Sequence, residues 1–213
     1  MIRVALADDH AVVRQGLSQI LSAQSDIRVV AEASNHGETL QMLRTYPCDV
    51  LILDVAMPGR SGMDTLKQVK AEHPKLPVLI LSMYPEDQYA FRALKAGAGG
   101  YLTKMAAVDQ VVHAIRTVAS GRKYITIELA EVLADGLERG DDVPRPEVLS
   151  DREYQTLRMI AQGHRIQEIG EALSLSPKTV SVYRARLCQK LRLGTTAELT
   201  RYAMEHGLLD EPR

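Results

Sequence analysis

The chain has 213 residues, a formal net charge of −1, 46% hydrophobic residues and 25% charged residues. These values are ordinary for a globular protein of one large or two small domains. No apolar run approaches the roughly 20 residues of a membrane span, and charged residues at Arg3, Asp8 and Asp9 interrupt the region where a signal peptide needs its apolar core. Cys48 and Cys188 are too far apart for a metal-binding pair. We therefore expect a cytoplasmic protein with reduced thiols.

Short apolar runs alternate with amphipathic stretches over the first 120 residues. This alternation predicts an α/β fold of the (βα)5 type, with a parallel sheet and helices on both of its faces. The expected strands are 3–7, 27–33, 50–54, 78–82 and 100–103, and the expected helices are 11–23, 36–46, 62–73, 85–96 and 107–119.

Polar side chains follow four of these strands at the point where each strand ends. Asp54 closes the apolar run 50–53, the pair Asp8 and Asp9 follows the first strand, and Ser82 and Lys104 end two others. Open α/β sheets carry their chemistry at this edge. A carboxylate there can accept a phosphoryl group, carboxylates are the ligands that Mg²⁺ prefers, and an ammonium and a hydroxyl can bind phosphoryl oxygens. The pattern predicts a phosphoryl site.

The same residues resemble the receiver domain of bacterial two-component response regulators. The resemblance covers about 120 residues and implies a flavodoxin-like receiver at 1–121, in which Asp54 accepts phosphate from a phosphohistidine on a sensor histidine kinase. It implies that Mg²⁺ is bound by Asp9, Asp54 and the carbonyl of Ala56, with Asp8 acting through water. It further implies roles for a switch hydroxyl, a rotating aromatic side chain and a phosphate counter-ion, which would be Ser82, Tyr101 and Lys104 respectively. One departure is Met105, which stands where many receivers have proline after the lysine.

The segment 122–147 has a different composition. Residues 124–147 hold seven acids and two bases, and 140–146 reads Gly-Asp-Asp-Val-Pro-Arg-Pro. Glycine, proline and charge at this density predict a linker, with a short helix over 127–138.

From residue 148 onward the pattern is helical throughout. Ser150 and Glu153 have the spacing of a capping box, and Ser176-Pro177 supplies an N-cap followed by proline at the first helical position. The segment 176–192 contains five basic residues and no acid, which is the kind of stripe that phosphate backbones attract. A short helix, a tight turn and a longer basic helix predict a small all-α helix-turn-helix domain at 148–213 that binds double-stranded DNA.

A helical projection of the basic segment predicts two faces. Val180, Tyr183, Leu187 and Leu191 form a buried stripe, and small or basic residues occupy the opposite side. Small side chains let a helix enter the major groove closely, and basic side chains mainly contact phosphates. The residues expected to contact DNA are Lys178, Thr179, Ser181, Val182, Tyr183, Arg184, Ala185, Arg186 and Lys190.

The C-terminal domain resembles the LuxR-type helix-turn-helix through several short motifs, at 149–153, 161–163, 168–169, 175–180 and 190–191. Together with the receiver, this resembles a complete response regulator of the NarL/FixJ family. The resemblance implies a homodimer when the protein is phosphorylated or bound to DNA, with RNA polymerase as a further candidate partner. Leu199, Tyr202 and Ala203 are the expected dimer seam in the last helix, with core packing inside the domain as the open alternative.

Two other functions compete with a phosphorylation-switched transcription regulator. A phosphatase with an aspartyl-phosphate intermediate typically needs a second acid two residues after its nucleophile, and Ala56 stands at that position. A DNA-binding protein could also use its receiver only as a dimerisation module, but the complete set of acids argues against this. We therefore expect a regulator and not an enzyme.

Overall fold

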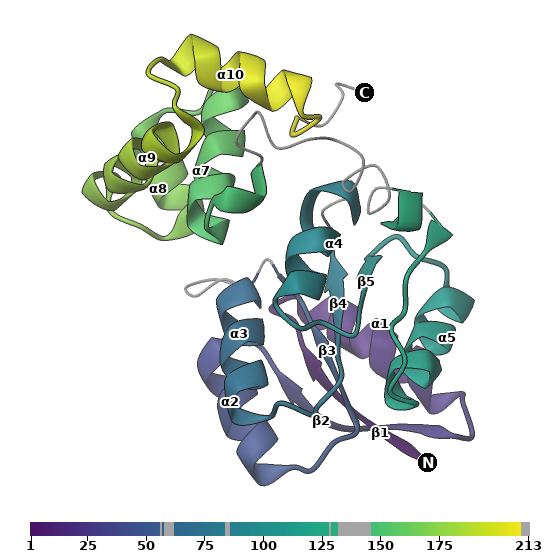
Figure 1. The fold of residues 1–213 in the computed structure, drawn as a ribbon. Helices are drawn as coiled ribbons and strands as arrows, with labels where there is room; N and C mark the ends of the chain where they lie inside the picture. Colours follow the sequence, from purple (N-terminus) through teal and green to yellow (C-terminus); the bar gives the residue numbers. More distant parts are fainter. Residues whose placement is uncertain (56, 58–61, 84–85, 128, 132–145, 210–213) are drawn as a thin grey trace. The chain divides into compact units, whose positions relative to one another are not determined.

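Five parallel strands and the helices between them build the first of two structural units, residues 1–138 and 139–213, in a computed structural model (Figure 1). The structure describes residues 1–55, 57, 62–83, 86–127, 129–131 and 146–209. The strand order β2-β1-β3-β4-β5 is that of flavodoxin-like sheets, and it confirms the predicted fold class. The elements are β1 (Ile2–Ala7), α1 (Ala11–Ser22), β2 (Ile27–Ala33), α2 (His36–Thr45), β3 (Val50–Leu53), α3 (Gly62–Glu72), β4 (Val78–Ser82), α4 (Glu86–Lys95), β5 (Gly100–Thr103) and α5 (Val108–Ala119).

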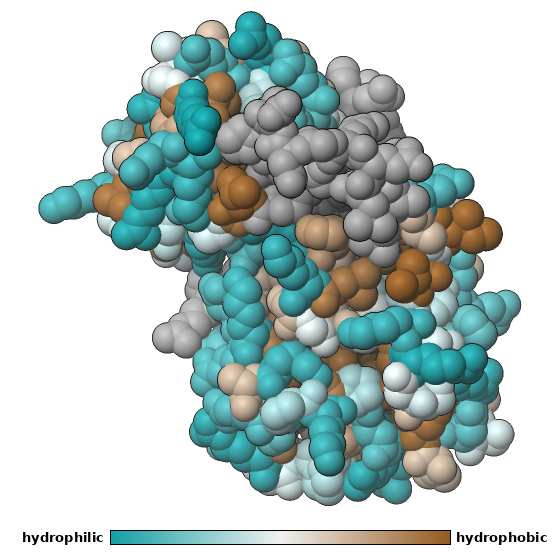
Figure 2. Space-filling view, viewed as in Figure 1, coloured by the Kyte–Doolittle hydropathy of each residue, from teal (hydrophilic) through white to brown (hydrophobic). Residues whose placement is uncertain are grey.

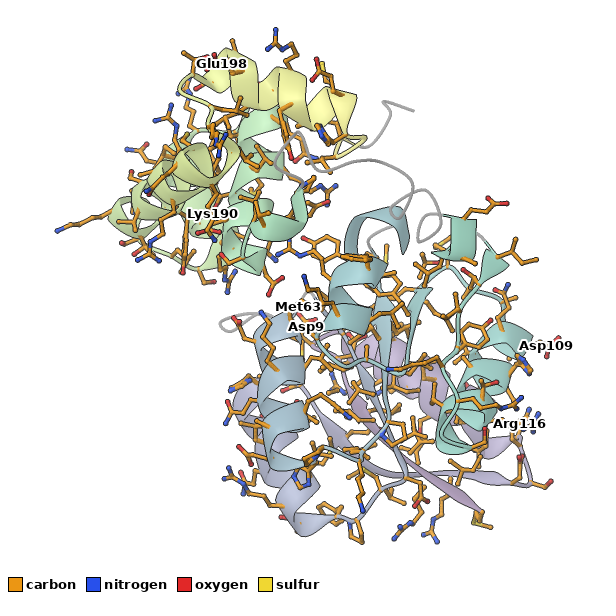
Figure 3. All side chains as sticks on the ribbon, viewed as in Figure 1. Asp9, Met63, Asp109, Arg116, Lys190 and Glu198 are labelled. Carbon is orange, nitrogen blue, oxygen red and sulfur yellow. The ribbon has the colours of Figure 1, made fainter. Side chains whose placement is uncertain are left out.

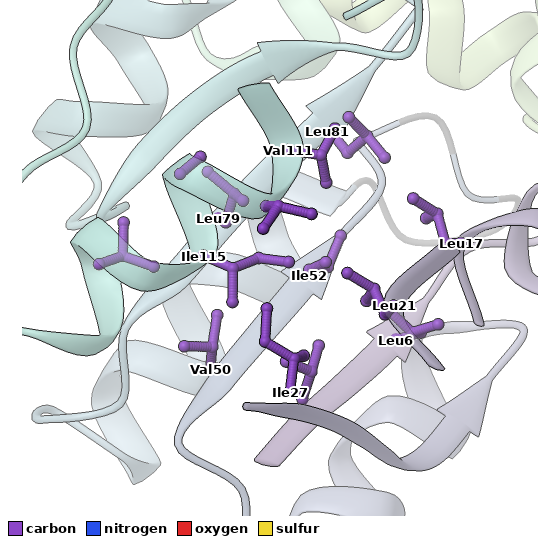
Figure 4. Packing of buried hydrophobic residues seen from close by; sticks show 14 of the residues in the cluster. Leu6, Leu17, Leu21, Ile27, Val50, Ile52, Leu79, Leu81, Val111 and Ile115 are labelled. Carbon is purple, nitrogen blue, oxygen red and sulfur yellow. The ribbon is translucent and has the colours of Figure 1, made fainter. Parts of the chain in front are cut away.

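The strands are apolar on both sides because helices cover both faces of the sheet. On the side of α1 and α5, alternate strand residues form one cluster with residues of these helices, and Figure 4 shows this packing around Ile52, Leu79 and Ile115. Residues of the opposite parity, such as Leu53 and Ile80, are equally buried and face the other layer. The sheet is therefore buried on both faces, and this packing fixes the positions of the strand ends.

Strand register brings the polar strand ends to one edge. Ala7 pairs with Leu53, Leu53 pairs with Ile80, and Ser82 pairs with Thr103. The residues that follow these strands therefore emerge side by side, at the carboxyl edge of the sheet. The backbone N–H of Asp54 donates to the carbonyl of Ala7 at 2.8 Å, which extends this alignment by one residue.

The segment after α5 continues to pack on the receiver. Tyr124 forms a parallel bridge with Gly100, and its N–H donates to the carbonyl of Gly99 at 2.9 Å. A Cβ atom at Gly100 would lie 2.9 Å from the Tyr124 carbonyl oxygen, so only glycine permits this approach. The prediction that a linker starts at residue 122 therefore differs from the structure, where residues up to 131 belong to the first unit. The rest of the predicted linker, 132–145, lies outside the described residues.

The second unit is helical, as predicted. Ser150 and Glu153 form the expected capping box, and the Ser176 hydroxyl accepts from the Thr179 N–H at 3.1 Å. Gly170 lies where the helix-turn-helix closes, and a Cβ there would be 2.7 Å from the Leu175 carbonyl oxygen. The elements are η1 (Pro146–Val148), α7 (Asp151–Ala161), α8 (Ile166–Leu173), α9 (Pro177–Leu191) and α10 (Thr196–Glu205).

The last helix contributes to the core of its own domain. Leu199 and Ala203 are fully buried and Tyr202 is 5% exposed, and α10 packs against α7. These three residues were the expected dimer seam, but side chains buried inside one protomer cannot also contact a second one. The structure thus favours the alternative that they are core residues. Among the described residues, no helix is long and apolar enough to cross a membrane.

Candidate functional site

Lys104 joins two carboxylates at the carboxyl edge of the sheet. Its ammonium lies 2.9 Å from Asp54 Oδ2 and 2.7 Å from Asp8 Oδ2, and all three side chains are almost completely buried. The backbone N–H of Lys104 donates to the Ser82 carbonyl at 2.6 Å, so β4 and β5 hold the lysine in place. The structure therefore brings together Asp8, Asp54 and Lys104, which directly follow β1, β3 and β5.

The site has an excess of negative charge. The carboxylates of Asp8, Asp9 and Asp54 lie around the ammonium of Lys104, and one oxygen atom from each acid lies within 4.8 Å of the others. One carboxylate oxygen of Asp9, which Figure 3 labels at this edge, is buried and makes no hydrogen bond to any described residue. A hard divalent cation would satisfy this oxygen and neutralise the excess charge. The donor set thus fits Mg²⁺.

The surroundings of Lys104 keep it charged. Burial disfavours the ammonium form, but hydrogen bonds to Asp8 and Asp54 outweigh burial and raise the pKa of Lys104 above its ordinary value. A lysine that stays protonated at neutral pH is a permanent counter-ion for whatever anion occupies the site.

The other expected receiver residues lie nearby or outside the described part. Ser82 is fully buried at the end of β4, and Tyr101 is fully buried in β5 opposite Ile80. The carbonyl of Ala56, an expected Mg²⁺ ligand, lies outside the described residues. The peptide bond between Lys104 and Met105 is trans, as expected for a bond that no proline follows.

Two residues at the site were not found by sequence reasoning. His10 Nδ1 lies 2.9 Å from Asp9 Oδ1, without the geometry of a hydrogen bond. Arg14, one helical turn into α1, donates to the carbonyl of Asp8 at 2.6 Å. The only available signal for His10 was its position directly after the two acids, and Arg14 had none because it contacts the backbone.

The basic helix α9 has the two predicted faces. Val180 and Leu187 are fully buried and Leu191 is 3% exposed, so most of the predicted stripe is in the core. Lys178 and Arg186 are exposed and make no ion pair with any described residue. Between them, Val182 presents an apolar side chain that is 43% exposed. The remaining expected contacts on this helix that are exposed or half-buried are Thr179, Ser181, Tyr183 and Ala185.

Two basic residues of α9 contact side chains of neighbouring helices in the same domain. The Lys190 ammonium, labelled in Figure 3, lies 2.6 Å from Glu153 Oε2 of α7. Arg184 Nη2 lies 3.5 Å from Thr196 Oγ1 at the start of α10. We predicted both as DNA contacts, and these predictions stand beside contacts within the domain, of which the Lys190–Glu153 pair is the shorter.

The Glu153–Lys190 pair should make the domain sensitive to acid. Burial raises the pKa of Glu153, but the hydrogen bonds from Lys190 and Ser150 outweigh it, so the net pKa lies below the ordinary value near 4.5. A lowered carboxyl pKa stabilises the fold above the ordinary pKa, and this contribution is lost as pH falls below it. We expect Glu153→Gln to lower the free energy of unfolding by about 1–2 kcal/mol at pH 7, because Lys190 is partly exposed and the pair is worth less than a fully buried one.

Thermal unfolding of the wild type and Glu153→Gln at pH 7 and pH 4 measures this effect. The difference in Tm between the two proteins should shrink at pH 4. A difference of equal size at both pH values would mean that the carboxylate charge is not the stabilising feature.

Comparison with known families agrees with this geometry. Residues 4–116 match the model of the response regulator receiver domain, and residues 147–203 match the model of bacterial regulatory proteins of the luxR family. The two matches cover the two structural units separately and together span most of the chain.

The chain is also similar to known proteins over almost its whole length. The chain is 39% identical over 209 residues to the response regulator UvrY of Escherichia coli strain K12, which covers 98% of this chain and 96% of the relative. It is 38% identical over 216 residues to the oxygen regulatory protein NreC of Staphylococcus haemolyticus, with 98% and 100% coverage. Among solved structures, the RcsB response regulator of Salmonella typhimurium is similar with a TM-score of 0.63 at 25% identity, covering 96% of this chain and 100% of that one.

Proposed function

The chain belongs to the response regulators that join a receiver domain to a LuxR-type DNA-binding domain, and from this premise we propose that phosphorylation of Asp54 controls its binding to DNA. Members of this family are DNA-binding transcription regulators and not enzymes. The observation that carries the proposal is the buried contact of Lys104 with Asp54 and Asp8. This contact supports the proposal because a carboxylate that accepts a phosphoryl group needs a cation beside it, and the Lys104 ammonium lies 2.9 Å from Asp54 Oδ2.

The proposed reaction is a transfer from a phosphohistidine on a sensor histidine kinase. An Asp54 carboxylate oxygen attacks phosphorus, the bond between phosphorus and the histidine nitrogen breaks, and the imidazole leaves with the electron pair. Lys104 pairs with the phosphoryl oxygens after the transfer, because its ammonium already lies 2.9 Å from the acceptor carboxylate. Asp9, Asp54 and the carbonyl of Ala56 would hold Mg²⁺ directly, with Asp8 acting through water. The ion would reduce the repulsion between the carboxylates and the incoming phosphoryl group.

Ser82 and Tyr101 are the proposed switch residues. Ser82 ends β4 and Tyr101 lies in the neighbouring strand, and both are fully buried near the acceptor edge. A phosphoryl group on Asp54 adds charge and acceptor oxygens that the Ser82 hydroxyl could bind. Movement of the Ser82 side chain toward the phosphoryl group would leave space into which the Tyr101 ring can rotate. This rotation would change the protein surface at the carboxyl ends of β4 and β5.

The proposed output is binding of α9 in the major groove of double-stranded DNA. Ser181 and Val182 would read base edges, and Lys178 and Arg186 would contact phosphates. We infer that two copies bind one site in the cytoplasm, with RNA polymerase as a further candidate partner. Because the predicted seam residues are core, the exposed residues Ala197, Arg201 and Met204 of α10 are the surface that we assign to the second copy.

The test compares the wild-type protein with and without acetyl phosphate and Mg²⁺. Intact mass should increase by one phosphoryl group, and fluorescence anisotropy with a duplex selected from a random pool by the phosphorylated protein should show affinity that rises several-fold. Sedimentation of the same complex should give two protomers per duplex. Equal affinity with and without the phosphodonor would favour a DNA-binding protein whose receiver is only a dimerisation module.

A further inference from the structure

Arg14 of α1 contacts the backbone of the acidic pair Asp8 and Asp9 in the phosphoryl site. We propose that Arg14 is a positioning residue that holds the peptide between Asp8 and Asp9 in the orientation needed for Mg²⁺ binding. The inference rests on the proposed function of this site and adds a residue that does not itself touch the metal or the phosphate.

The contacts of Arg14 hold the backbone of Asp8 from one side. Its Nη1 donates to the Asp8 carbonyl at 2.6 Å, and its Nε donates to Glu32 Oε2 at 3.3 Å. Its side chain is only 18% exposed, so the guanidinium has little freedom to leave. On the other side of the same residue, the Asp8 N–H donates to the Ala33 carbonyl at 3.1 Å. Both peptide groups that flank Asp8 are therefore fixed.

The carbonyl that Arg14 binds belongs to the peptide group that joins Asp8 to Asp9. Because a peptide group is planar, its orientation sets ψ of Asp8 and φ of Asp9 together. A change in either angle that the other does not compensate moves Asp9 relative to Asp8. It would therefore move the buried Asp9 Oδ1, which lies 2.9 Å from His10 Nδ1 but accepts no hydrogen bond from a described residue, relative to Asp54.

The chemistry of arginine suits this task. The planar guanidinium donates from Nη1 to the carbonyl and from Nε to Glu32 in fixed relative directions, and Glu32 prevents the group from rotating. A lysine could supply the charge and one hydrogen bond but not this fixed fork. A glutamine would supply neither the charge nor the reach.

A purely structural role is the alternative. The Arg14–Glu32 ion pair alone, in which the Glu32 side chain is 39% exposed, would contribute little to stability, and its loss would lower Tm slightly without changing Mg²⁺ affinity. The two roles therefore differ in a direct measurement of metal binding.

The experiment is an isothermal titration of Mg²⁺ into the unphosphorylated full chain. We expect Arg14→Gln to raise the Kd for Mg²⁺ about tenfold, as is typical when a residue that orients metal ligands is removed. Arg14→Lys should fall between Arg14→Gln and the wild type, and Glu32→Gln should weaken binding less than Arg14→Gln. The matched control is Arg44→Gln on α2, which removes an exposed pair with Glu72 and should leave the Kd unchanged.

A second measurement separates this inference from the proposed function. With acetyl phosphate, Arg14→Gln should reach the wild-type extent of phosphorylation once Mg²⁺ is raised about tenfold. If the wild type is not phosphorylated, the proposed function fails whatever Arg14 does. If the wild type is phosphorylated and Arg14→Gln binds Mg²⁺ within twofold of it while losing Tm, only the positioning role is overturned. Should Arg14→Gln not fold, Arg14→Lys and Glu32→Gln decide by the same criterion.

Discussion

Replacing Asp54 by asparagine is expected to abolish phosphorylation of the chain by acetyl phosphate in the presence of Mg²⁺. The amide oxygen of asparagine carries no negative charge and cannot form a stable acyl phosphate, whereas the carboxylate can. The change keeps the size and shape of the side chain, so the packing around this buried position is retained. Intact mass spectrometry should show one added phosphoryl group on the wild type and none on Asp54→Asn.

The same variant should remain folded. Lys104 keeps its contact with Asp8 at 2.7 Å, and removal of one carboxylate reduces the repulsion among the three acids. Because Lys104 stays paired, we expect the free energy of unfolding to fall by at most about 1–2 kcal/mol, which is less than the cost of leaving a buried charge unpaired. Circular dichroism during urea unfolding can measure this change. Asp109→Asn, at the exposed start of α5, is the matched control and should be phosphorylated normally. Full labelling of Asp54→Asn would show that another residue accepts the phosphate.

Loss of DNA affinity on neutralising the exposed face of α9 is the second large effect. Each phosphate contact contributes a slope of about 0.9 to the dependence of log K on log salt concentration. Lys178→Ala with Arg186→Ala removes two such contacts, so the slope should fall by about 1.8 and the affinity at 0.15 M salt by about 30-fold. Fluorescence anisotropy with a 30-base-pair duplex of arbitrary sequence, at several salt concentrations, measures both quantities.

Lys190→Ala provides the matched comparison because it removes the same charge from the same helix. Since Lys190 pairs with Glu153 at 2.6 Å, we expect this variant to lower Tm and to leave the salt slope almost unchanged. A decrease in slope equal to that of Lys178→Ala would mean that Lys190 leaves Glu153 to contact DNA, and the original prediction for Lys190 would stand. An unchanged slope in the double variant would exclude this face of α9 as the DNA-binding surface.

Helix α9 illustrates how far sequence patterns reach. The Ser176-Pro177 start and the buried positions Val180, Leu187 and Leu191 agree with the pattern, because caps and periodicity are local properties of a helix. The contacts of Lys190 with Glu153 and of Arg184 with Thr196 were not predictable in this way. Their partners come from α7 and α10, and the sequence does not reveal which residues of two helices meet when they pack.

The last helix and the linker show the same limit. Periodicity placed Leu199, Tyr202 and Ala203 on one apolar face but could not say whether a second protomer or α7 covers it. The start of the linker was misplaced because Tyr124 lacks a strand pattern around it and pairs with the sheet by a single bridge. On the face seen in Figure 2, hydrophobic residues lie in separate patches among hydrophilic ones.

The sequence by itself determined the fold class and the edge of the sheet where the chemistry lies. Parallel strands must end at a common edge, so acids and a lysine that follow successive strands are brought together whatever the details of packing. Only the tertiary structure decided how these groups are arranged: Lys104 bridges Asp8 and Asp54, and Arg14 holds the peptide of Asp8. The reason is that such contacts depend on side-chain directions and on backbone atoms from separate elements, and residue type and spacing carry no record of either.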